Sequence, residues 1–450
     1  MQIIADLQLH SRYSRAVSQK MDLREIATWS AKKGISLVAT GDWTHPLWIR
    51  EIKSNLEETS DGIFKLKNSP VGSTGSAQAR FLLSTEISSI YSQGGKLRRV
   101  HNLIFSPSIE TSDKIIKELQ RRGANLLADG RPIVGISSVN LLKMVLEIDE
   151  DVLFIPAHIW TPWFSLFGSK SGFDSIEECF GDLSRYIYAI ETGLSSDPLM
   201  NWQIKELDTR SILSFSDAHS GPKLGREATV FTCNMKHVTC NFTYSDISDA
   251  IKQKPNSHLK IGYTIEFFPE EGKYHWSGHR NCNIRFSPVE VKDKGTLCPV
   301  CKQPLTIGVE NRVIDLSYKT LSPEEILFVK NNSGVTFVSD KEKKRRPFVS
   351  LVPLLEILTE LHNHSPTKAI RDYENITANF ASEFEILLKK SYDEIRQQGG
   401  DRLMEGIKTV RERKVSVDPG YDGVFGMVKI FKNNDKTSEE KKQESQPSLF

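Results

Sequence analysis

The sequence predicts an α/β protein that begins with a β/α barrel and continues through a short Cys- and His-rich segment into a mainly helical C-terminal part. Three observations predict this class. Up to about residue 262, short apolar runs alternate with stretches of helical spacing such as "DLREIATWSAKKG". Ligand-type side chains accompany these runs, and two Cys and His pairs come directly afterwards. Residues 350–413 then repeat apolar side chains at helical spacing, and "PGYDGVFGMVKIF" indicates a turn and a final pair of strands.

Length and composition describe an ordinary globular protein. A chain of 450 residues exceeds the usual size of one hydrophobic core, so we expect two or three domains. The apolar runs are too short to span a bilayer, and the N-terminus lacks the basic and apolar regions of a signal peptide. We therefore expect a cytoplasmic protein with no membrane partner. A net charge of +2 does not by itself indicate a polyanionic partner, so that inference must rest on local patches.

Side chains that commonly bind metals end or lie within seven of the apolar runs. The first run, "IIADLQLH", ends at Gln8 and His10, and the last, "ILSFSDAH", ends at Asp217 and His219. The runs between them supply Asp42 and His45, Glu86, His101, His158, and Glu191. Because the carboxyl ends of the strands of a β/α barrel meet at one mouth, we expect these side chains to meet there.

One His after a strand is usually structural, but this set is different. Carboxylates and imidazoles gathered at one mouth would repel each other and lack partners without a cation. Mixed imidazole and carboxylate ligands favour zinc or manganese over calcium. The sequence therefore predicts a multinuclear site of divalent ions, with zinc first and manganese or magnesium as alternatives.

The order of the motifs "DLQLHS", "GDWTHP", "STEIS", "VHN", "PAH", "ETG" and "SDAHS" resembles the PHP (polymerase and histidinol phosphatase) superfamily. Its members are distorted seven-stranded barrels that hold up to three metals for phosphoester hydrolysis. The segments "GDWTHPLW", "PAHIWTPWFS", "ETGLSSDP" and "SDAHSGPKLGREA" resemble, more particularly, the endonuclease Q family of DNA repair nucleases. The resemblance runs to about residue 431. We expect a PHP barrel over 1–265, a zinc ribbon over 266–318, a DNA-binding domain over 319–431 and a tail over 432–450.

The resemblance also implies roles for individual residues. Asp217 matches the catalytic aspartate of the family, as both metal ligand and orienter of the attacking water. The other implied ligands are His10, His45, Glu86, His101, His158 and His219. Gln8 stands where the first motif of the family usually has His, and a neutral carboxamide is a weaker ligand than an imidazole. Asp6, Asp42 and Glu191 are either ligands or partners that fix the imidazoles, and their spacing leaves both roles open.

A second metal site is predicted from spacing alone. His279 and Cys282 form H-x2-C, and Cys298 and Cys301 form C-x2-C after fifteen intervening residues. Two such knuckles supply four tetrahedral zinc ligands in a segment too short to build its own core. His275 is a less favoured candidate for the first position. A closed four-ligand site is architectural, so we expect one structural zinc ion without a catalytic role.

The endonuclease Q resemblance implies the substrate. It is DNA with a deaminated base (uracil, hypoxanthine or xanthine) or an abasic site, nicked on the 5′ side of the lesion. A base that is inspected outside the stack needs an aromatic pocket, for which the candidates are Trp160, Trp163 and Phe164. Arg98, Arg99 and Arg226 are candidates for phosphate contacts, although ion pairs explain them equally well. The basic run "KEKKRRPF" is either a solvated loop or a DNA contact through Lys343, Lys344, Arg345 and Arg346.

The polar tail "KNNDKTSEEKKQESQPSLF" lacks the periodicity of a packed element and is expected to be disordered. Its end, "QPSLF", resembles the pentapeptide that binds the bacterial sliding clamp, through Gln446, Leu449 and Phe450, with Pro447 as a mismatch. Read from Gln443, the same end resembles a PCNA-interacting box. We expect tethering to a sliding clamp and prefer the bacterial one.

Together these features predict metal-assisted hydrolysis of a DNA phosphodiester. Two other classes stay open. One is a PHP-type phosphatase or 3′–5′ exonuclease. The zinc ribbon, the basic run and the tail argue against a small-molecule substrate for such an enzyme. The other is a non-catalytic, clamp-tethered DNA-binding protein whose metal centre is weakened by Gln8.

Overall fold

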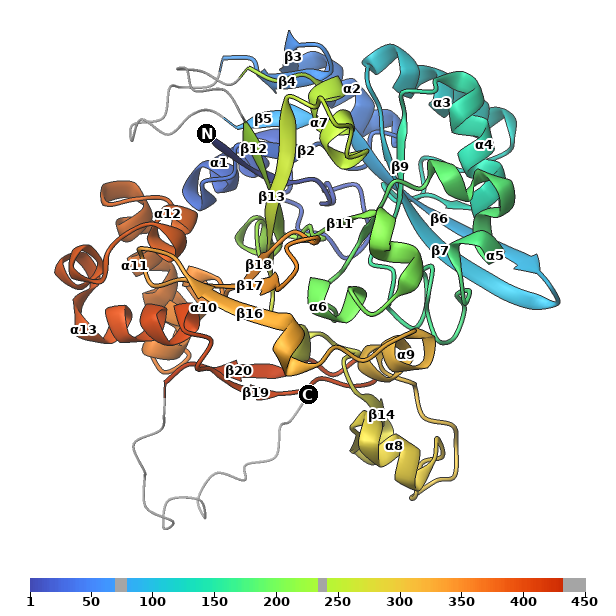
Figure 1. Ribbon diagram of the computed structural model, residues 1–450. Coiled ribbons are helices and arrows are strands. Elements are labelled where there is room, and N and C mark those ends of the chain that lie inside the picture. Colours follow the sequence, from blue (N-terminus) through green and yellow to red (C-terminus); the bar gives the residue numbers. More distant parts are fainter. Residues whose placement is uncertain (69–78, 234–240, 432–450) are drawn as a thin grey trace, which may run out of the picture.

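The computed structural model describes residues 1–68, 79–233 and 241–431. It is a mixed α/β fold with one large mixed sheet and helices around it (Figure 1). Within these residues, no helix has the length and apolar character to cross a membrane. The clamp-motif residues Gln446, Leu449 and Phe450 lie outside the described residues, with the rest of the tail.

The strand β1 (Gln2–Asp6) lies in the interior of a ten-stranded sheet. It pairs in parallel with β2 (Leu37–Ala39) and antiparallel with β12 (Ala228–Cys233). Beyond β2 the sheet continues through β5 (Arg80–Leu82), β4 (Ile63–Leu66) and β3 (Leu56–Ser60). Beyond β12 it continues through β13 (Leu259–Glu266), β18 (Phe348–Ser350), β17 (Thr336–Asp340) and β16 (Ile326–Lys330). Strands from the C-terminal part thus extend the sheet that the N-terminal part begins.

A second sheet contains the long hairpin of β6 (Ser84–Gln93) and β7 (Lys96–Phe105), which extends away from the body of the molecule (Figure 1). It is completed by β8 (Ile133–Val134) and β9 (Leu153–Pro156). The short strands β10 (Ala189–Glu191) and β11 (Ser211–Leu213) pair in parallel. The described strands form separate hydrogen-bonded sheets, so the closed PHP barrel remains a prediction.

Helices follow the strands of the first part of the chain. The predicted helix after Asp22 is α1 (Leu23–Lys33), where Asp22 accepts hydrogen bonds from two backbone N–H groups and Gly34 ends the helix at φ 85°. Its buried face includes Ile26 and Trp29. The other helices of this part are α2 (Pro46–Asn55), α3 (Ile109–Arg121), α4 (Ser138–Ile148), α5 (Ile176–Phe180), α6 (Pro198–Asn201) and α7 (Tyr244–Ile251).

The Cys- and His-rich segment forms a small projecting lobe (Figure 1). It comprises the hairpin of β14 (Ser277–His279) and β15 (Ile284–Phe286), followed by α8 (Pro288–Lys294) and α9 (Val309–Leu316). Its own core has only four buried side chains, Phe286, Val291, Cys298 and Leu305. So small a core does not stabilise a lobe by itself.

The C-terminal part is helical, as its apolar spacing predicted. The helices are α10 (Leu354–Leu361), α11 (Pro366–Asn379), α12 (Glu383–Leu388) and α13 (Tyr392–Arg411), and α13 is interrupted at Gly400. The predicted final strand pair is β19 (Ser416–Asp418) with β20 (Met427–Lys429). A buried ion pair between Lys33 Nζ and Glu383 Oε2, 2.8 Å apart, joins α12 to α1.

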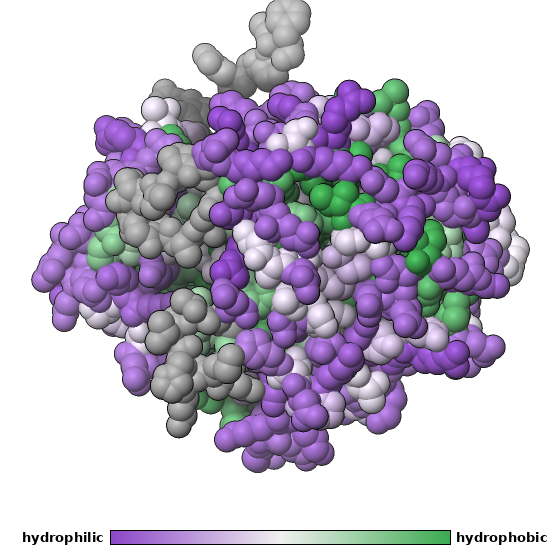
Figure 2. Space-filling view, turned by 90° about the horizontal axis from the view of Figure 1, so that it is seen from above, coloured by the Kyte–Doolittle hydropathy of each residue, from purple (hydrophilic) through white to green (hydrophobic). Residues whose placement is uncertain are grey.

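The apolar core lies between the sheets and the surrounding helices. One large cluster extends from Ile4 in β1 to Ile430 near the end of the described chain, so the N- and C-terminal parts share it. The outer face seen in Figure 2 is mainly hydrophilic, with small apolar patches. The described chain therefore buries most of its apolar side chains between these elements.

Candidate metal centre

Six of the predicted ligands meet in one cluster, and Glu86 is at its centre. Glu86 lies on β6, and its side chain is 1% exposed. Its Oε2 lies 2.9 Å from His10 Nε2, and its Oε1 lies 2.6 Å from His101 Nδ1 and 3.1 Å from His158 Nε2. These imidazoles come from the segment after β1, from β7 and from the segment after β9. Both oxygens of one carboxylate thus face imidazoles from three separate elements.

The remaining two ligands approach His10 from the segment after β11. Asp217 Oδ1 lies 3.3 Å from His10 Nε2 and 3.8 Å from His219 Nδ1. The cluster therefore contains two groups of ligand atoms, each within 4.8 Å of one another: Glu86, His101 and His158 in one, His10, Asp217 and His219 in the other. Glu86 connects the two groups through His10, so the geometry suits two neighbouring ions.

Backbone geometry directs these side chains inward. The first and last motifs are joined, because the backbone N–H of His10 donates to Ala218 O at 3.0 Å. His158 and Asp217 have positive φ angles of 28° and 46°, which are costly for residues other than Gly. At Gly193, in "ETG", a Cβ atom would lie 2.5 Å from His158 Cβ. These backbone conformations direct the side chains of His158 and Asp217 toward the cluster. The periodicity of the sequence does not reveal them.

Asp42 orients His10. Asp42 Oδ1 lies 2.9 Å from His10 Nδ1, while its Oδ2 accepts hydrogen bonds from Ser11 N, Ser11 Oγ and Ser14 Oγ. Burial opposes the charge of Asp42, but His10 and these donors hold the pKa of Asp42 below its usual value. Both Asp42 oxygens are thus occupied, which favours the role of a partner that fixes the imidazole and turns His10 Nε2 toward Glu86.

Asp6 accepts hydrogen bonds from the segment that carries Asp217. Its oxygens accept from Ser216 N at 3.0 Å, Ser216 Oγ at 2.6 Å and Gly225 N at 2.9 Å. Burial is the main reason that the pKa of Asp6 is raised to about 6, against the lowering effect of these bonds. Asp6 therefore fastens β1 to the segment that carries Asp217, and its occupied oxygens again favour a supporting role.

The cluster fits a bound cation. His10 Nε2 lies 2.9 Å from Glu86 Oε2 and 3.3 Å from Asp217 Oδ1, yet neither His10 Nε2 nor Asp217 Oδ1 makes a well-directed hydrogen bond among the described residues. A coordinated ion would satisfy such buried polar atoms. Burial would lower the pKa of His10, yet Asp42, Asp217 and Glu86 raise it well above its usual value. The site therefore strongly attracts positive charge, and its mixed donors suit zinc or manganese.

Gln8 and Glu191 interact with each other. With its amide nitrogen turned toward Glu191, Gln8 donates to both oxygens of that carboxylate. Glu191 Oε2 also accepts from the backbone N of His158 at 2.7 Å. Burial, followed by the charges of Asp217 and Glu86, raises the pKa of Glu191 well above its usual value. Gln8 is thus a donor to Glu191, and a ligand role for Gln8 remains a prediction.

His45 lies outside both ligand groups. It precedes α2 as its N-cap, and its Nδ1 accepts from Leu47 N at 3.3 Å. Its ring stacks on Tyr13 with centroids 4.5 Å apart. Burial lowers the pKa of His45, which keeps the imidazole neutral. Its predicted ligand role therefore has less geometric support than those of the six clustered residues.

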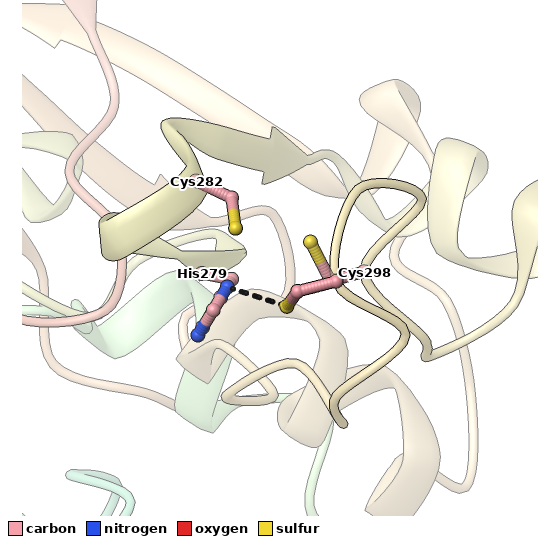
Figure 3. A group of neighbouring side chains, drawn as sticks. His279, Cys282 and Cys298 are labelled. Atoms are coloured by element: carbon pink, nitrogen blue, oxygen red, sulfur yellow. Dashed lines mark hydrogen bonds between the residues drawn. The ribbon is translucent and has the colours of Figure 1, made fainter.

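The predicted zinc ligands of the lobe come together. His279 Nδ1 lies 3.4 Å from Cys301 Sγ, and the ligand atoms of His279, Cys282, Cys298 and Cys301 lie within 4.8 Å of one another. Figure 3 shows His279, Cys282 and Cys298 turned toward a common centre. Burial opposes the thiolate of Cys298, but backbone N–H groups and His279 lower its pKa to about 6, which favours a thiolate ligand. The competitor His275 faces Ser195 O instead, at 3.3 Å.

The aromatic candidates differ in exposure. Trp160 is 1% exposed and donates to Asn201 Oδ1 at 2.8 Å, so it belongs to the core. Trp163 and Phe164 are half-buried. The ring of Phe164 lies 4.8 Å from that of His101, beside the metal centre. Of the three, Trp163 and Phe164 are thus accessible from solvent, and Phe164 is the one that lies beside the cluster.

Most of the basic candidates have protein partners. Arg98 is buried, lies 2.7 Å from Glu178 Oε1 and packs on Phe173. Arg226 donates to Ser216 O at 2.9 Å and to Asp217 O at 3.4 Å, so it supports the backbone of the segment that carries Asp217. Arg99 lies over the ring of Phe164, with its guanidinium carbon 5.4 Å from the centroid. Arg98 and Arg226 therefore act within the protein, and Arg99 is the one nearest the aromatic pair.

The residues of the basic run also differ in whether they have protein partners. Arg345 is bonded to Asp208 and to Trp202 O, and Lys344 Nζ lies 2.6 Å from Glu342 Oε2. Lys343 and Arg346 are exposed. Of the four predicted DNA contacts, these two are exposed and make no ion pair with an acid among the described residues, whereas Lys344 is exposed but paired with the exposed Glu342.

Sequence reasoning missed Arg131, whose Nη1 lies 3.4 Å from Glu86 Oε2. It follows no strand, and its surroundings "ADGRP" indicate only a turn. No periodicity would have found it.

No family model matches this chain. An uncharacterized protein of Methanocaldococcus jannaschii is 29% identical over 293 residues, which cover 63% of this chain and 33% of that protein. This chain thus spans a third of the length of that relative. An uncharacterized protein of Bacillus subtilis is 26% identical over 404 residues, which cover 89% of this chain and 90% of that protein.

Two solved structures are similar over nearly the whole chain. The lesion-specific endonuclease EndoQ of Pyrococcus furiosus has a TM-score of 0.77 and 26% identity, covering 96% of both chains. Endonuclease Q in complex with a 27-mer duplex, with an abasic lesion at its active site, has a TM-score of 0.79 and 27% identity. That match covers 98% of this chain and 99% of the other. The chain is therefore a structural relative of endonuclease Q, as its strand-end motifs predicted.

Proposed function

We propose that this protein is a metal-dependent DNA repair endonuclease that nicks DNA on the 5′ side of a deaminated base or an abasic site. One observation carries the proposal. Six imidazole and carboxylate side chains from separate elements form two adjacent groups of ligand atoms around Glu86. The similar endonuclease Q structure with an abasic lesion at its active site supports the choice of substrate.

His10, Asp217 and His219 would hold one divalent ion and Glu86, His101 and His158 a second, with zinc as the first choice and manganese or magnesium as alternatives. Bound there, such ions supply Lewis acidity, which lowers the pKa of a coordinated water and polarises a phosphate oxygen. The side chains of this chain determine where this chemistry takes place. Asp42 fixes the tautomer of His10, and Arg226 supports the backbone of Asp217.

Asp217 is the proposed catalytic residue. Its side chain is 28% exposed, whereas that of Glu86 is 1% exposed, so Asp217 faces both the ligand groups and solvent. Burial opposes its charge, but His10 and His219 hold the pKa of Asp217 below its usual value. A charged carboxylate in this position accepts a hydrogen bond from an attacking water and orients it toward phosphorus.

We propose that residues 1–265 form a distorted PHP barrel, 266–318 a zinc ribbon with one structural ion, and 319–431 a DNA-binding domain. The four clustered ligands of the small lobe support the ribbon. The shared sheet, in which β13 pairs with β18, supports a rigid connection between the first and third parts. The ribbon has a closed set of four ligands, so we assign it no catalytic role.

We propose that Trp163 and Phe164 stack on a base turned out of the duplex, because both are half-buried and the ring of Phe164 lies beside that of His101. Arg99, Lys343 and Arg346 are the proposed phosphate contacts. Trp160 would support this wall from the core. The tail would bind a bacterial sliding clamp, or PCNA as the alternative, through Gln446, Leu449 and Phe450, in the cytoplasm at the nucleoid.

The test is a labelled duplex with one internal uracil, beside matched duplexes with an abasic site or no lesion. We expect a single nick 5′ to the lesion that requires divalent metal and is lost in Asp217→Ala. Glu147→Ala is the matched control, because Glu147 is an exposed acid on α4 outside both sites. Shortening from the duplex ends would instead favour the exonuclease. Binding without cleavage would favour the non-catalytic protein.

A further inference from the structure

Arg131 lies at the rim of the metal centre. It belongs to the turn between α3 and β8, and its Nη1 lies 3.4 Å from Glu86 Oε2. Its side chain is 25% exposed, whereas that of Glu86 is 1% exposed. The guanidinium therefore contacts the buried carboxylate and is also accessible to a ligand from solvent.

The turn that carries Arg131 is fixed against the centre. The backbone N–H of Arg131 donates to Asp129 Oδ1 at 3.1 Å, and Gly130 N donates to Tyr13 O at 3.0 Å. A Cβ atom on Gly130 would lie 2.5 Å from Asp42 Oδ2, so this close approach requires Gly. The residue before Arg131 is thus held against the same Asp42 that orients His10, and little ordering of the turn is needed when a ligand binds.

A purely structural ion pair is the alternative explanation. Arg411, a fully buried arginine, shows the structural pattern: it donates to four backbone carbonyls at 2.6–3.0 Å. Arg131 has one long side-chain contact among the described residues, and both oxygens of its partner Glu86 already face imidazoles. A guanidinium has five N–H donors, so most of those of Arg131 are available to a ligand.

We propose that Arg131 binds the scissile phosphate and stabilises the negative charge that its oxygens gain in the transition state. This inference rests on the proposed nuclease function. A planar guanidinium matches two phosphate oxygens with two parallel hydrogen bonds. Among the described residues, Arg131 is the only arginine or lysine paired with a carboxylate of the cluster, where unbalanced acids would repel a phosphate.

The role of Arg131 is electrostatic. Water forms a bond to phosphorus with an oxygen lone pair and releases a proton. The bond from phosphorus to the leaving sugar oxygen breaks, and that oxygen keeps the electron pair and takes up a proton. Arg131 stays protonated throughout, because a guanidinium does not titrate near neutral pH. Its attraction to the phosphate oxygens increases as their charge increases, which lowers the barrier.

Steady-state nicking of the uracil duplex by Arg131→Gln, Arg131→Lys and Arg131→Ala tests this role. We expect Arg131→Gln to lower kcat by about 100-fold, the scale of losing one transition-state donor, with a smaller change in KM. Arg131→Lys should recover only part of the rate, because an ammonium lacks the planar fork. Free guanidinium ions should restore part of the activity of Arg131→Ala. Arg121→Gln, on the exposed last turn of α3, is the charge-matched control and should behave as wild type.

Metal content and a second substrate separate the outcomes. Bound metal per chain should be unchanged in Arg131→Gln, since Arg131 is not a ligand. A wild-type kcat, or a rate loss fully explained by lost metal, would overturn the proposal and leave Arg131 as a support for Glu86. If the wild type nicks no duplex, the proposed nuclease function fails, and hydrolysis of bis(p-nitrophenyl) phosphate still tests Arg131. A wild type that hydrolyses neither substrate overturns both.

Discussion

The two candidate metal sites of this chain are built in opposite ways. The ribbon ligands lie within 23 residues of sequence, from His279 to Cys301, around a core of four buried side chains. The six clustered candidate ligands that include Glu86 extend from His10 to His219, in a part of the chain that contributes to the large shared core. We therefore expect zinc to stabilise the small lobe, whereas the large core keeps the side chains of the cluster in place. Metal loss should unfold the first region and leave the second folded.

The largest expected effect is the unfolding of the small lobe when its zinc is lost. Cys298→Ser should release one zinc ion per chain and unfold residues 277–306, because structural zinc contributes about 10 kcal/mol or more to such small lobes. Limited proteolysis should then cleave within the lobe, while metal bound at the cluster is retained. Cys233→Ser is the control, because Cys233 lies outside the four ligands of the lobe and outside the cluster around Glu86. This variant should keep its zinc. A lobe that stays protease-resistant without zinc would contradict the contrast between the two regions.

A smaller effect is expected on metal affinity at the cluster around Glu86. Gln8→His should tighten metal binding at the cluster by about 10-fold, the lower end of the range for residues that support metal ligands. Titration of the metal-depleted protein with zinc measures the affinity. Gln8→Met is the matched variant, since it removes the amide donor to Glu191 without adding a ligand. Unchanged zinc stoichiometry and activity in Gln8→His would show that position 8 is not a ligand position.

A third expected effect concerns the chain segment that connects the two regions. Glu271 lies in the turn η4 (Pro269–Glu271) between β13 and β14, and burial together with the charge of Glu356 raises its pKa to about 9. The folded protein therefore holds this proton more tightly than the unfolded chain does. The stabilisation is full below the unfolded pKa of about 4.3 and is lost as the pH rises toward 9, by at most about 1.4 kcal/mol per pH unit.

Chemical denaturation between pH 5 and pH 9 measures this dependence. Glu271→Gln should flatten it, because the amide does not ionise. Glu147→Gln, at an exposed acid on α4, should leave it unchanged. Equal pH dependence in Glu271→Gln and wild type would show that this carboxyl is not the cause.

Local features of the fold and sites were predictable. The helix after Asp22, the helical segment 350–413 and the grouping of His279 with Cys282, Cys298 and Cys301 depend on neighbours in sequence. The hairpin of β6 and β7 was harder to predict, because "RRVHNLIF" indicates a strand that holds His101 but does not show which strand it pairs with. His101 lies within β7, which pairs antiparallel with β6, and it reaches Glu86 from there.

The sequence by itself determined the ligand types, their order and the ribbon, because residue chemistry and short spacing are local properties. Only the tertiary structure decided that Asp42 and Asp6 have their oxygens occupied by protein donors, that Trp160 is core, that Arg98 is paired, and that Arg131 reaches Glu86. The physical reason is that a hydrogen-bond partner or a burial fraction depends on segments up to two hundred residues away. No local pattern specifies those distances.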